Sequence, residues 1–292
     1  MQILVIGGTG FIGSHVSRQL LAMGHRVCVF HRGRTEASLP NEIQQLRSDL
    51  GIHALVNLRE KIFRFNPDSV INMIAMTEDD AKRTMHTFVG RTGRLVVVSS
   101  GDVYLAYARF TRLESGPIEP MPLREDSALR TKLYPYRSQA ANREDILYDY
   151  DKILVERAVR GNADLAGTVI RLPKVYGPGR NADFATVHRY RHHPNWRWTH
   201  GYVENVAAAI ALTAVHPRAI GGTFHVGEER TPTVAERLAD ISPSKLPIDE
   251  TDHDFRQDMV YDTRKIREEL SYCEIVPYSQ GIRMTLESMP AV

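Results

Sequence analysis

Seven residues near the N-terminus, Gly7-Gly8-Thr9-Gly10-Phe11-Ile12-Gly13, decide the fold through what stands on either side of them. The preceding run, Ile3 to Ile6, is continuously apolar, as expected for a short strand buried on both faces. The following run, Phe11 to Met23, has helical spacing and stops at Gly24, a typical residue for a helix end. A strand, a glycine-rich turn and a helix in this order predict the first repeat of a parallel α/β sheet.

The spacing of the glycines predicts a dinucleotide-binding turn. The segment fits both G-x-G-x-x-G, with Gly8, Gly10 and Gly13, and G-x-x-G-x-x-G, in which Gly7 takes the first place. A tight turn needs residues without Cβ, the backbone must approach a pyrophosphate, and the helix N-terminus then faces the negative charge. The alternative is a glycine-rich turn without a ligand, but the strand before it and the helix after it favour the dinucleotide.

The residues at the end of the second strand indicate which of the two nicotinamide dinucleotides, NAD or NADP, the chain would bind. Val27 to Phe30 is the expected strand, and His31-Arg32-Gly33-Arg34 follows it. An NAD enzyme usually has Asp or Glu here to hold the ribose 2′-OH, and this stretch has no acid. Guanidinium groups suit a 2′-phosphate, so Arg32 and Arg34 favour NADP over NAD. The alternative is that both arginines are solvated loop charges.

Strand and helix signals continue to alternate, which predicts a parallel sheet with helices on both faces. Further strands are expected at 70–74, 95–98, 168–172 and 223–226, and further helices at 78–89, 140–159, 203–215 and 263–270. The stretch 113–135 contains Pro117, Pro120, Pro122 and Pro135 and predicts a long loop.

The composition is that of ordinary globular material and excludes disordered and fibrous classes. The 292 residues, 42% hydrophobic and 25% charged, suit one large domain or a large domain with a smaller appendage. A formal net charge of +2 gives no electrostatic case for nucleic acid or an anionic membrane. The chain has only two cysteines, and its start is unlike a secretory signal. It contains no apolar run near the roughly 20 residues of a membrane span. We therefore expect a cytoplasmic location.

Several motifs, in order along nearly the whole chain, resemble the extended short-chain dehydrogenase/reductase superfamily, and within it the NAD-dependent epimerase/dehydratase family. They are the glycine turn and the segments 72–76, 96–104, 171–179, 202–207, 224–227 and 262–265. The resemblance implies a Rossmann-type doubly wound parallel sheet with a small C-terminal substrate-binding lobe. Residues 1–172 would form the core, with an insertion near 105–135, and residues 173–292 the lobe, interleaved with late core elements. The cofactor would lie against Gly7, Gly10, Phe11, Ile12, Gly13 and Ala75.

The same resemblance implies an active site of a Ser or Thr, a Tyr and a Lys, which Ser100, Tyr148 and Lys152 match. Positions i and i+4 share one helix face, so the phenol and the ammonium would face one cleft. A nearby cation favours phenolate, which would let Tyr148 act as base or acid near neutral pH. Lys152 would also hold the nicotinamide ribose, and Ser100 would bind the substrate oxygen. Tyr136 is a rival tyrosine, but Ala140 stands where the lysine is needed.

Asp102 lies at the position where family dehydratases have an acid that moves a proton during water elimination. As a catalytic acid it would indicate a dehydratase. The alternative is a strand-end residue that caps a neighbouring turn, which would leave an epimerase or a simple reductase.

The substrate side is short. Between Gly179 and Tyr202 the chain has fewer residues than the family usually uses for a nucleotide diphosphate, which favours a substrate smaller than a sugar nucleotide. Arg197 and Trp198 are candidates to hold an anion and a planar group, or else belong to a basic loop with packed tryptophans. Three nearby histidines, His188, His192 and His193, lack a recognised zinc motif, so we expect a surface cluster and no metal.

Two classes of function remain. The first is an enzyme that transfers hydride between NADP or NAD and a secondary alcohol or ketone carbon, in a sugar nucleotide or a smaller carbonyl compound. The second is a dinucleotide-binding sensor or RNA-associated scaffold, against which the retention of Ser100, Tyr148 and Lys152 argues. The expected partner is a small-molecule substrate and not nucleic acid, and the resemblance also suggests a homodimer formed by paired helices.

Overall fold

The computed structural model describes residues 1–35, 37–55, 57 and 59–289. The chain divides into two compact units. The first unit comprises Met1–Ser100, Leu133–Arg171 and Ala207–Phe224, and the second unit comprises Gly101–Lys132, Leu172–Val206 and His225–Val292.

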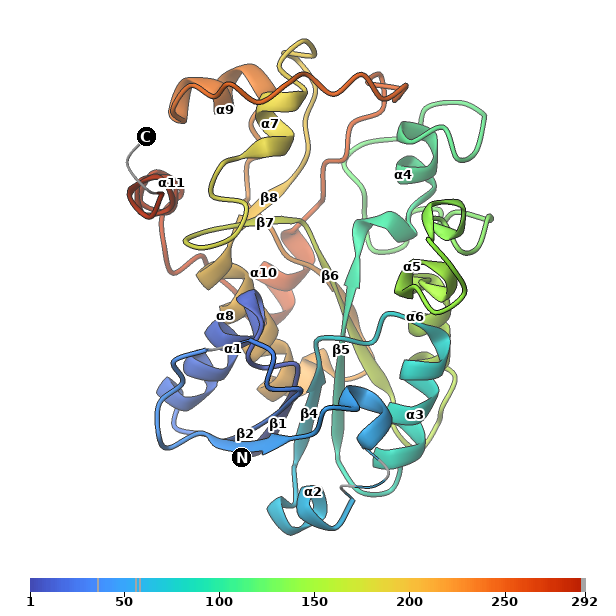
Figure 1. Cartoon of the computed structure of the whole chain (residues 1–292), viewed down its shortest axis with the longest axis vertical. Coiled ribbons are helices and arrows are strands. Elements are labelled where there is room, and N and C mark those ends of the chain that lie inside the picture. The colour runs from blue at the N-terminus through green and yellow to red at the C-terminus, as the bar shows by residue number, and fades with distance from the viewer. Residues whose placement is uncertain (36, 56, 58, 290–292) are drawn as a thin grey trace. The chain divides into compact units, whose positions relative to one another are not determined.

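A seven-stranded sheet in the order β3-β2-β1-β4-β5-β6-β9 forms the centre of the first unit (Figure 1). Neighbouring strands from β3 to β5 are parallel. The strand order reverses beside β1, which is where doubly wound sheets bind their ligands. The strands are β1 (Gln2–Ile6), β2 (Arg26–His31), β3 (Gln44–Arg47), β4 (Ser69–Asn72), β5 (Arg94–Ser100), β6 (Gly167–Leu172) and β9 (Thr223–His225).

Helices cover both faces of this sheet (Figure 1). α1 (Phe11–Ala22) and α8 (Val203–Val215) lie on one face, where the Ser69 hydroxyl donates to the carbonyl of Ala214. α3 (Glu78–Phe88) and α6 (Lys152–Arg160) pack together on the other face. Successive strand residues point to opposite faces, so every second one joins each core.

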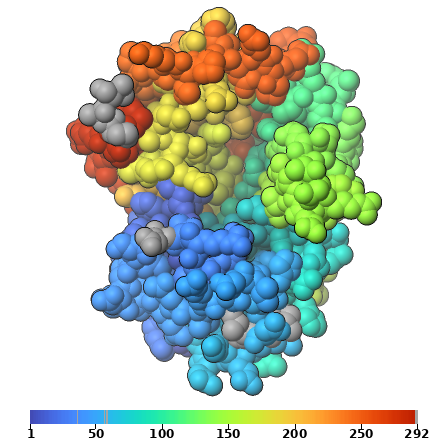
Figure 2. All heavy atoms as spheres, in the orientation of Figure 1, coloured from blue at the N-terminus to red at the C-terminus, as the bar shows by residue number. Residues whose placement is uncertain are grey.

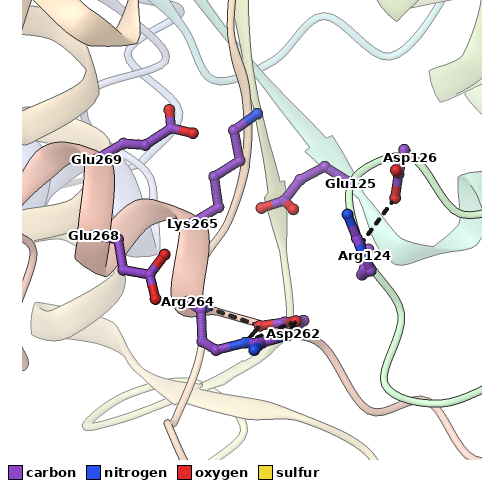
Figure 3. Close-up of a pocket in the computed structure, with 8 residues that line it drawn as sticks. All are labelled: Arg124, Glu125, Asp126, Asp262, Arg264, Lys265, Glu268 and Glu269. Atoms are coloured by element: carbon purple, nitrogen blue, oxygen red, sulfur yellow. Dashed lines mark hydrogen bonds and ion pairs between the residues drawn. The ribbon is translucent and has the colours of Figure 1, made fainter.

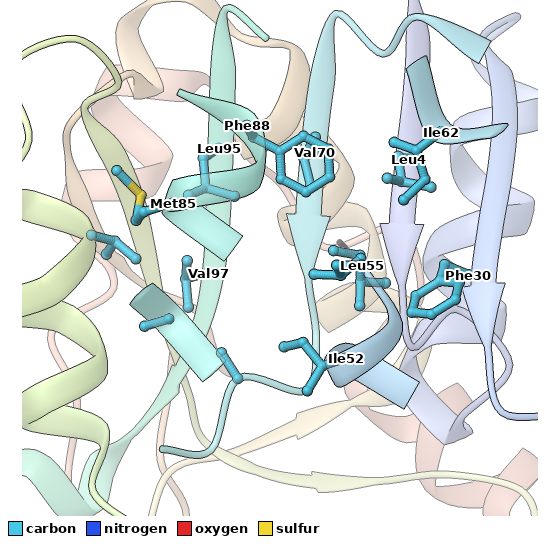
Figure 4. Packing of buried hydrophobic residues seen from close by; sticks show 14 of the residues in the cluster. Leu4, Phe30, Ile52, Leu55, Ile62, Val70, Met85, Phe88, Leu95 and Val97 are labelled. Atoms are coloured by element: carbon cyan, nitrogen blue, oxygen red, sulfur yellow. The ribbon is translucent and has the colours of Figure 1, made fainter. Parts of the chain in front are cut away.

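The core beneath α3 and α6 is continuous (Figure 4). It also receives side chains from η1 (Gly51–Ala54) and α2 (Arg59–Phe65). Burying one such side chain contributes roughly 1.5–3 kcal/mol, so this core fixes the sheet that carries the glycine turn. Its members include Leu4, Phe30, Ile62, Val70, Met85, Phe88 and Leu95.

The second unit has a small parallel sheet of β7 (Lys174–Tyr176) and β8 (His200–Tyr202). Phe110, at the end of α4 (Leu105–Phe110), stacks on Trp196 with 4.8 Å between ring centroids and meets Phe255 edge-on. The remaining helical elements of this unit are η2 (Gly101–Val103), α7 (Ala185–Arg189), α9 (Val234–Asp240), α10 (Arg264–Leu270) and α11 (Tyr278–Glu287).

Residues 101–132 belong to the second unit, whereas the sequence led us to place this stretch in the core as an insertion. The reason is pairing with distant chain. The Leu123 N–H donates to the Val260 carbonyl and the Asp262 N–H donates to the Leu123 carbonyl, each at 2.7 Å. Aromatic packing of Phe110 adds to these bonds, and neither kind of contact leaves a local pattern in the sequence.

The predicted helix over 140–159 is wrong as a continuous element. The structure has three short pieces instead, η3 (Arg137–Gln139), α5 (Ile146–Asp149) and α6. The segment before α6 is prominent in yellow-green on the surface (Figure 2), and Arg143, Glu144 and Ile146 are exposed there.

No helix within the described ranges is both long and apolar enough to span a membrane. Cys28 is buried, Cys273 is exposed, and both are free thiols.

Candidate functional site

The glycine turn has the geometry that a pyrophosphate requires. Gly7 has φ +87°, a conformation that side chains disfavour, and a Cβ on Gly13 would lie 2.3 Å from the carbonyl oxygen of Gly7. Gly10 is the N-cap of α1, and it makes no side-chain cap, so the first N–H groups of the helix stay available. A Cβ on Gly10 would meet nothing closer than 3.6 Å, which means that the turn is open at this position.

A cavity of about 110 Å³ continues from this turn to the end of β2. Arg32 and Arg34, which the sequence analysis assigns to a 2′-phosphate, both line it, together with Thr9, His31, Thr35, Gly51 and Ile74. Gly51 has φ +55°, and an added Cβ would press on the Arg32 side chain at 3.0 Å, so this turn holds the arginine in place. The residues present therefore fit a dinucleotide that carries a 2′-phosphate.

Arg47, at the end of β3, is a third cation that the sequence did not single out. A Cβ on Gly33 would lie 2.2 Å from its Nε, so the guanidinium packs directly against the Arg32–Arg34 loop. Burial lowers the pKa of His31, and Arg47 lowers it further. The sequence could not predict this position of Arg47, because only the pairing of β3 with β2 brings the residue to the loop.

Lys152 is the first residue of α6 and is buried. Its Nζ donates to the carbonyl of Ala75 at 2.6 Å and to that of Val98 at 3.1 Å. The Ala75 carbonyl belongs to the loop that follows β4, and the Val98 carbonyl belongs to β5. Lys152 is therefore fixed at the carboxyl edge of the sheet, and Ala75 contacts it there.

Tyr148 does not share a helix face with Lys152, so that prediction is wrong. Tyr148 lies in α5, and α6 begins only after Asp151, whose side chain accepts from the N–H of Ile153 at 2.9 Å and of Tyr134 at 2.6 Å. This N-cap interrupts the helix. The Tyr148 ring packs under the Arg137 guanidinium at 4.5 Å instead.

Tyr150 is the tyrosine that the structure places near the lysine. Its ring centroid lies 5.9 Å from Lys152 Nζ and 5.2 Å from the ring centroid of Tyr136. Tyr150 also forms an isolated bridge with Thr77, which precedes α3. Sequence spacing missed it because the family motif requires the tyrosine four positions before the lysine.

A buried ionic network stands behind the candidate serine. Ser99 Oγ donates to Glu156 Oε1 at 2.6 Å, and Arg171 holds both carboxylate oxygens through Nε at 2.9 Å and Nη2 at 2.7 Å. These three residues join β5, α6 and β6. Ser100, at the end of β5, is half-buried and follows directly on this network.

Asp102 is buried in the second unit, within η2. Its carbonyl accepts from Arg130 Nε at 2.8 Å. Arg130 is itself buried, so this bond secures the start of the 101–132 segment. It involves the main chain of Asp102, so the catalytic and the capping role of the Asp102 side chain both stay predictions.

The two predicted substrate residues have partners within the second unit. Arg197 pairs with Asp258, with Nε at 2.9 Å and Nη2 at 2.7 Å from Oδ2. Trp198 packs beside Trp196 and Phe110. Of the three histidines expected at the surface, His188 is buried, and burial lowers its pKa.

A cavity of about 450 Å³ in the second unit contains none of the predicted site residues (Figure 3). Its lining is wholly charged, with Asp262 held by Arg264 and Asp126 by Arg124. Glu125 points toward Lys265 across it, and burial raises the pKa of this carboxyl. The expected chemistry is therefore assigned to other residues.

Comparison with known proteins identifies a family. The model described as "NAD dependent epimerase/dehydratase family" matches residues 3–227. A 2′-dehydrokanamycin reductase of Streptomyces kanamyceticus is 29% identical over 63% of this chain and 45% of its own length. A probable UDP-arabinose 4-epimerase of Oryza sativa subsp. japonica is 28% identical over 76% of this chain and 55% of its own. The chain thus spans about half the length of these curated relatives.

Solved structures share the fold along the whole chain. The UDP-glucose 4-epimerase of Thermotoga maritima, solved with UDP-glucose, has a TM-score of 0.72 at 20% identity, covering 99% of this chain and 98% of that one. The UDP-glucose 4-epimerase of Thermus thermophilus, in complex with NAD, has a TM-score of 0.68 at 21% identity, with the same coverage.

Proposed function

Because this chain belongs to the NAD dependent epimerase/dehydratase family, we propose that it is a dinucleotide-dependent enzyme acting on a secondary alcohol or ketone carbon. The observation that carries the proposal is the buried Lys152, fixed by two carbonyls at the carboxyl edge of the sheet with a tyrosine ring beside it. A buried ammonium is costly unless it serves a partner, and here it can stabilise a phenolate.

We propose NADP as the preferred dinucleotide. Arg32 and Arg34 line the cavity at the end of β2, and Arg47 packs against their loop. When bound, NADP would supply or accept the hydride at the substrate carbon. The glycine turn would bind its pyrophosphate, and the arginines would hold the 2′-phosphate by charge-assisted hydrogen bonds.

We assign the proton transfer to Tyr150, with Tyr148 as the alternative that the family motif gives. The Tyr150 hydroxyl would give a proton to the substrate oxygen during reduction or take it during oxidation. Lys152 would favour the phenolate state of that tyrosine, and Ser100 would donate a hydrogen bond to the same oxygen. Proximity to Lys152 supports Tyr150, because the ammonium acts over a short distance only.

The substrate we propose is smaller than a sugar nucleotide. Arg197, a candidate to hold an anion of the substrate, is held by Asp258 through two contacts to the carboxylate. A diphosphate that bound to Arg197 would compete with this pair. A compact hydroxy or keto compound would not, and the short stretch between Gly179 and Tyr202 supports the same reading.

The test is a turnover assay with NADPH, NADP, NADH and NAD against a panel of small ketones, hydroxy acids and sugar nucleotides, read by the change in nicotinamide absorbance. Epimerisation, which has no net absorbance change, is followed by chromatography of the sugar. We expect turnover with a compact carbonyl substrate and a preference for the phosphorylated dinucleotide. If the protein binds neither dinucleotide, the proposal is wrong.

A further inference from the structure

A small cavity in the second unit is unused by the chemistry above. Its volume is about 60 Å³, enough for a group of a few non-hydrogen atoms. Its lining comes from β7, β8, the loop before α7 and the first residues of α7, and these three elements are labelled in Figure 1. The lining residues are Lys174, Tyr176, Asn181, Phe184, Ala185, Thr186 and His200.

Lys174 brings a positive charge to this cavity, and the Asp183 carboxylate acts on that charge without forming an ion pair with it. The residue is half-buried, and burial lowers the pKa of its ammonium. Among the described residues its Nζ makes no hydrogen bond and no ion pair, and it lies 5.8 Å from the centroid of the Trp198 ring. A partly desolvated ammonium without an ion-pair partner favours an anionic ligand.

The surroundings compensate this charge only in part, because burial lowers the pKa of Lys174 more than Asp183 raises it. Glu228 and Arg237 are both buried and pair with each other at 2.7 Å, so their charges cancel. His200 is buried, and its Nδ1–H donates to the Trp198 carbonyl at 2.7 Å. Burial holds the pKa of His200 far below its ordinary value, and Arg237 and Lys174 lower it further. The imidazole is therefore neutral, and its other nitrogen is a hydrogen-bond acceptor.

Tyr176 adds a donor. Its side chain is 1% exposed and lines the cavity, yet its hydroxyl has no hydrogen bond of normal geometry within the described part of the chain. Burial and the nearby Glu228 raise its pKa, so the hydroxyl keeps its proton. The Glu228 carboxylate faces this hydroxyl but is already held by Arg237, so the O–H can be donated to a ligand atom.

The loop at the cavity wall is held in an uncommon backbone conformation. Asn181 has φ +51° and Phe184 has φ +46°, both in the left-handed region. The Asn181 amide donates to the Val175 carbonyl at 2.6 Å, which fixes the loop against β7. Strained residues that the surrounding structure holds in place gather at ligand sites.

We propose that this cavity binds the oxyanion of a small molecule, either a carboxylate or a phosphate monoester, with Lys174 as the counter-charge and the Tyr176 hydroxyl as a donor. His200 supplies an acceptor, so the favoured anion also carries an O–H, as in a 2-hydroxy acid or a hydrogen phosphate. The inference stands on the second unit alone and holds whether or not the dinucleotide proposal is right.

The test is isothermal titration of the full chain with glycolate and, separately, with inorganic phosphate, at constant ionic strength. Wild-type protein should bind at least one probe saturably. Lys174→Gln should weaken that binding by at least about tenfold, the size of one charged hydrogen bond. Lys174→Arg should restore most of it, and Tyr176→Phe should weaken it while keeping the ring packing.

Lys61→Gln is the matched control, because Lys61 is exposed on α2 in the first unit. It should bind like wild type, and circular dichroism should show every variant folded. Binding of glycolate alone identifies a carboxylate ligand, and binding of phosphate alone a phosphoryl ligand. The proposal is overturned if wild type binds neither probe, or if Lys174→Gln binds as wild type does, since the anion would then sit elsewhere, for example at the glycine turn.

Discussion

Tyr148 and Tyr150 stand two positions apart and meet different neighbours. Tyr148 packs under Arg137, whereas Tyr150 lies beside Lys152. We predict that Tyr150→Phe lowers kcat by at least about a hundredfold, the usual contribution of a positioned acid or base. Dinucleotide affinity should change little, because the ring is retained. Tyr148→Phe, the matched control, should keep most of the activity, and a loss confined to Tyr148→Phe would return the role to the motif tyrosine.

Arg32 is the residue on which the choice of dinucleotide depends. Arg32→Ala should weaken NADPH binding by about tenfold or more, because one charge-assisted hydrogen bond contributes roughly 1.5–3 kcal/mol. NADH has no 2′-phosphate, so its affinity should stay nearly unchanged. Fluorescence titration with both dinucleotides measures this difference. Equal losses for NADPH and NADH would contradict the assignment.

At the residue scale, the sequence predicted what is encoded locally. The roles of Gly7, Gly10 and Gly13 could be predicted because the strand before them and the helix after them are adjacent in the sequence. Arg47 and Tyr150 were missed for a common reason. Arg47 reaches the cofactor loop only through strand pairing, and Tyr150 comes near Lys152 only because Asp151 interrupts the helix.

At the scale of elements, Glu156 connects three of them. It accepts from Ser99 on β5 and pairs with Arg171 on β6, while lying on α6 itself. Glu156→Ala would leave the Arg171 guanidinium buried without its partner, so the free energy of unfolding should fall by about 3–5 kcal/mol. Ser99→Ala should cost about 1 kcal/mol. Urea unfolding measures both.

The control for this network is Glu144→Ala, at an exposed position before α5. It should leave the unfolding free energy within about 0.5 kcal/mol of wild type. If Glu156→Ala were no more harmful than this control, the network would not be what holds α6, and with it Lys152, on the sheet.

The helices and strands could be predicted where the apolar residues follow a single pattern along the whole element. The apolar strands β1, β2, β4 and β5 and the helices α1, α3 and α8 lie close to their predicted ranges. The helix expected over 140–159 was not, because two acid caps, Asp145 and Asp151, start separate short helices inside it. Apolar periodicity does not register such caps.

At the scale of the whole molecule, buried histidines set the response to acid. Burial holds the pKa of His200 well below 6.5, and lowers those of His188 and His253 as well. The unfolded chain binds protons as the pH falls through 6.5, whereas these rings of the folded chain bind them only at lower pH. The stability from neutral burial is therefore complete above pH 6.5 and is lost below it.

The expected slope is up to about 1.4 kcal/mol per pH unit for each such histidine. His200→Gln should make the loss of stability on acidification shallower, even if the variant is less stable at neutral pH. His192→Gln, at an exposed position, should keep the wild-type slope. Thermal unfolding at several pH values compares them, and parallel curves for wild type and His200→Gln would count against this account.

The two units divide the chain differently from what its length and motifs predict. The first unit takes residues from three separate stretches, and the second unit takes the proline-containing segment along with the C-terminal part. The composition predicts that the chain forms a hydrophobic core, but it does not predict which unit contains residues 101–132. Their hydrogen-bond partners near 254–262 lie far away in the sequence.

The most direct test of the central claim, that this chain is a dinucleotide enzyme, is titration of NADPH into wild type and Gly10→Ala. A Cβ at Gly10 meets no protein atom within 3.6 Å, so the fold should tolerate it, yet it would stand where the pyrophosphate must approach. Gly93→Ala, with its nearest contact at 3.7 Å, is the matched control. We predict that wild type and Gly93→Ala bind one NADPH per chain and that folded Gly10→Ala binds at least about tenfold more weakly. Absence of binding by wild type, or equal binding by Gly10→Ala, would contradict it.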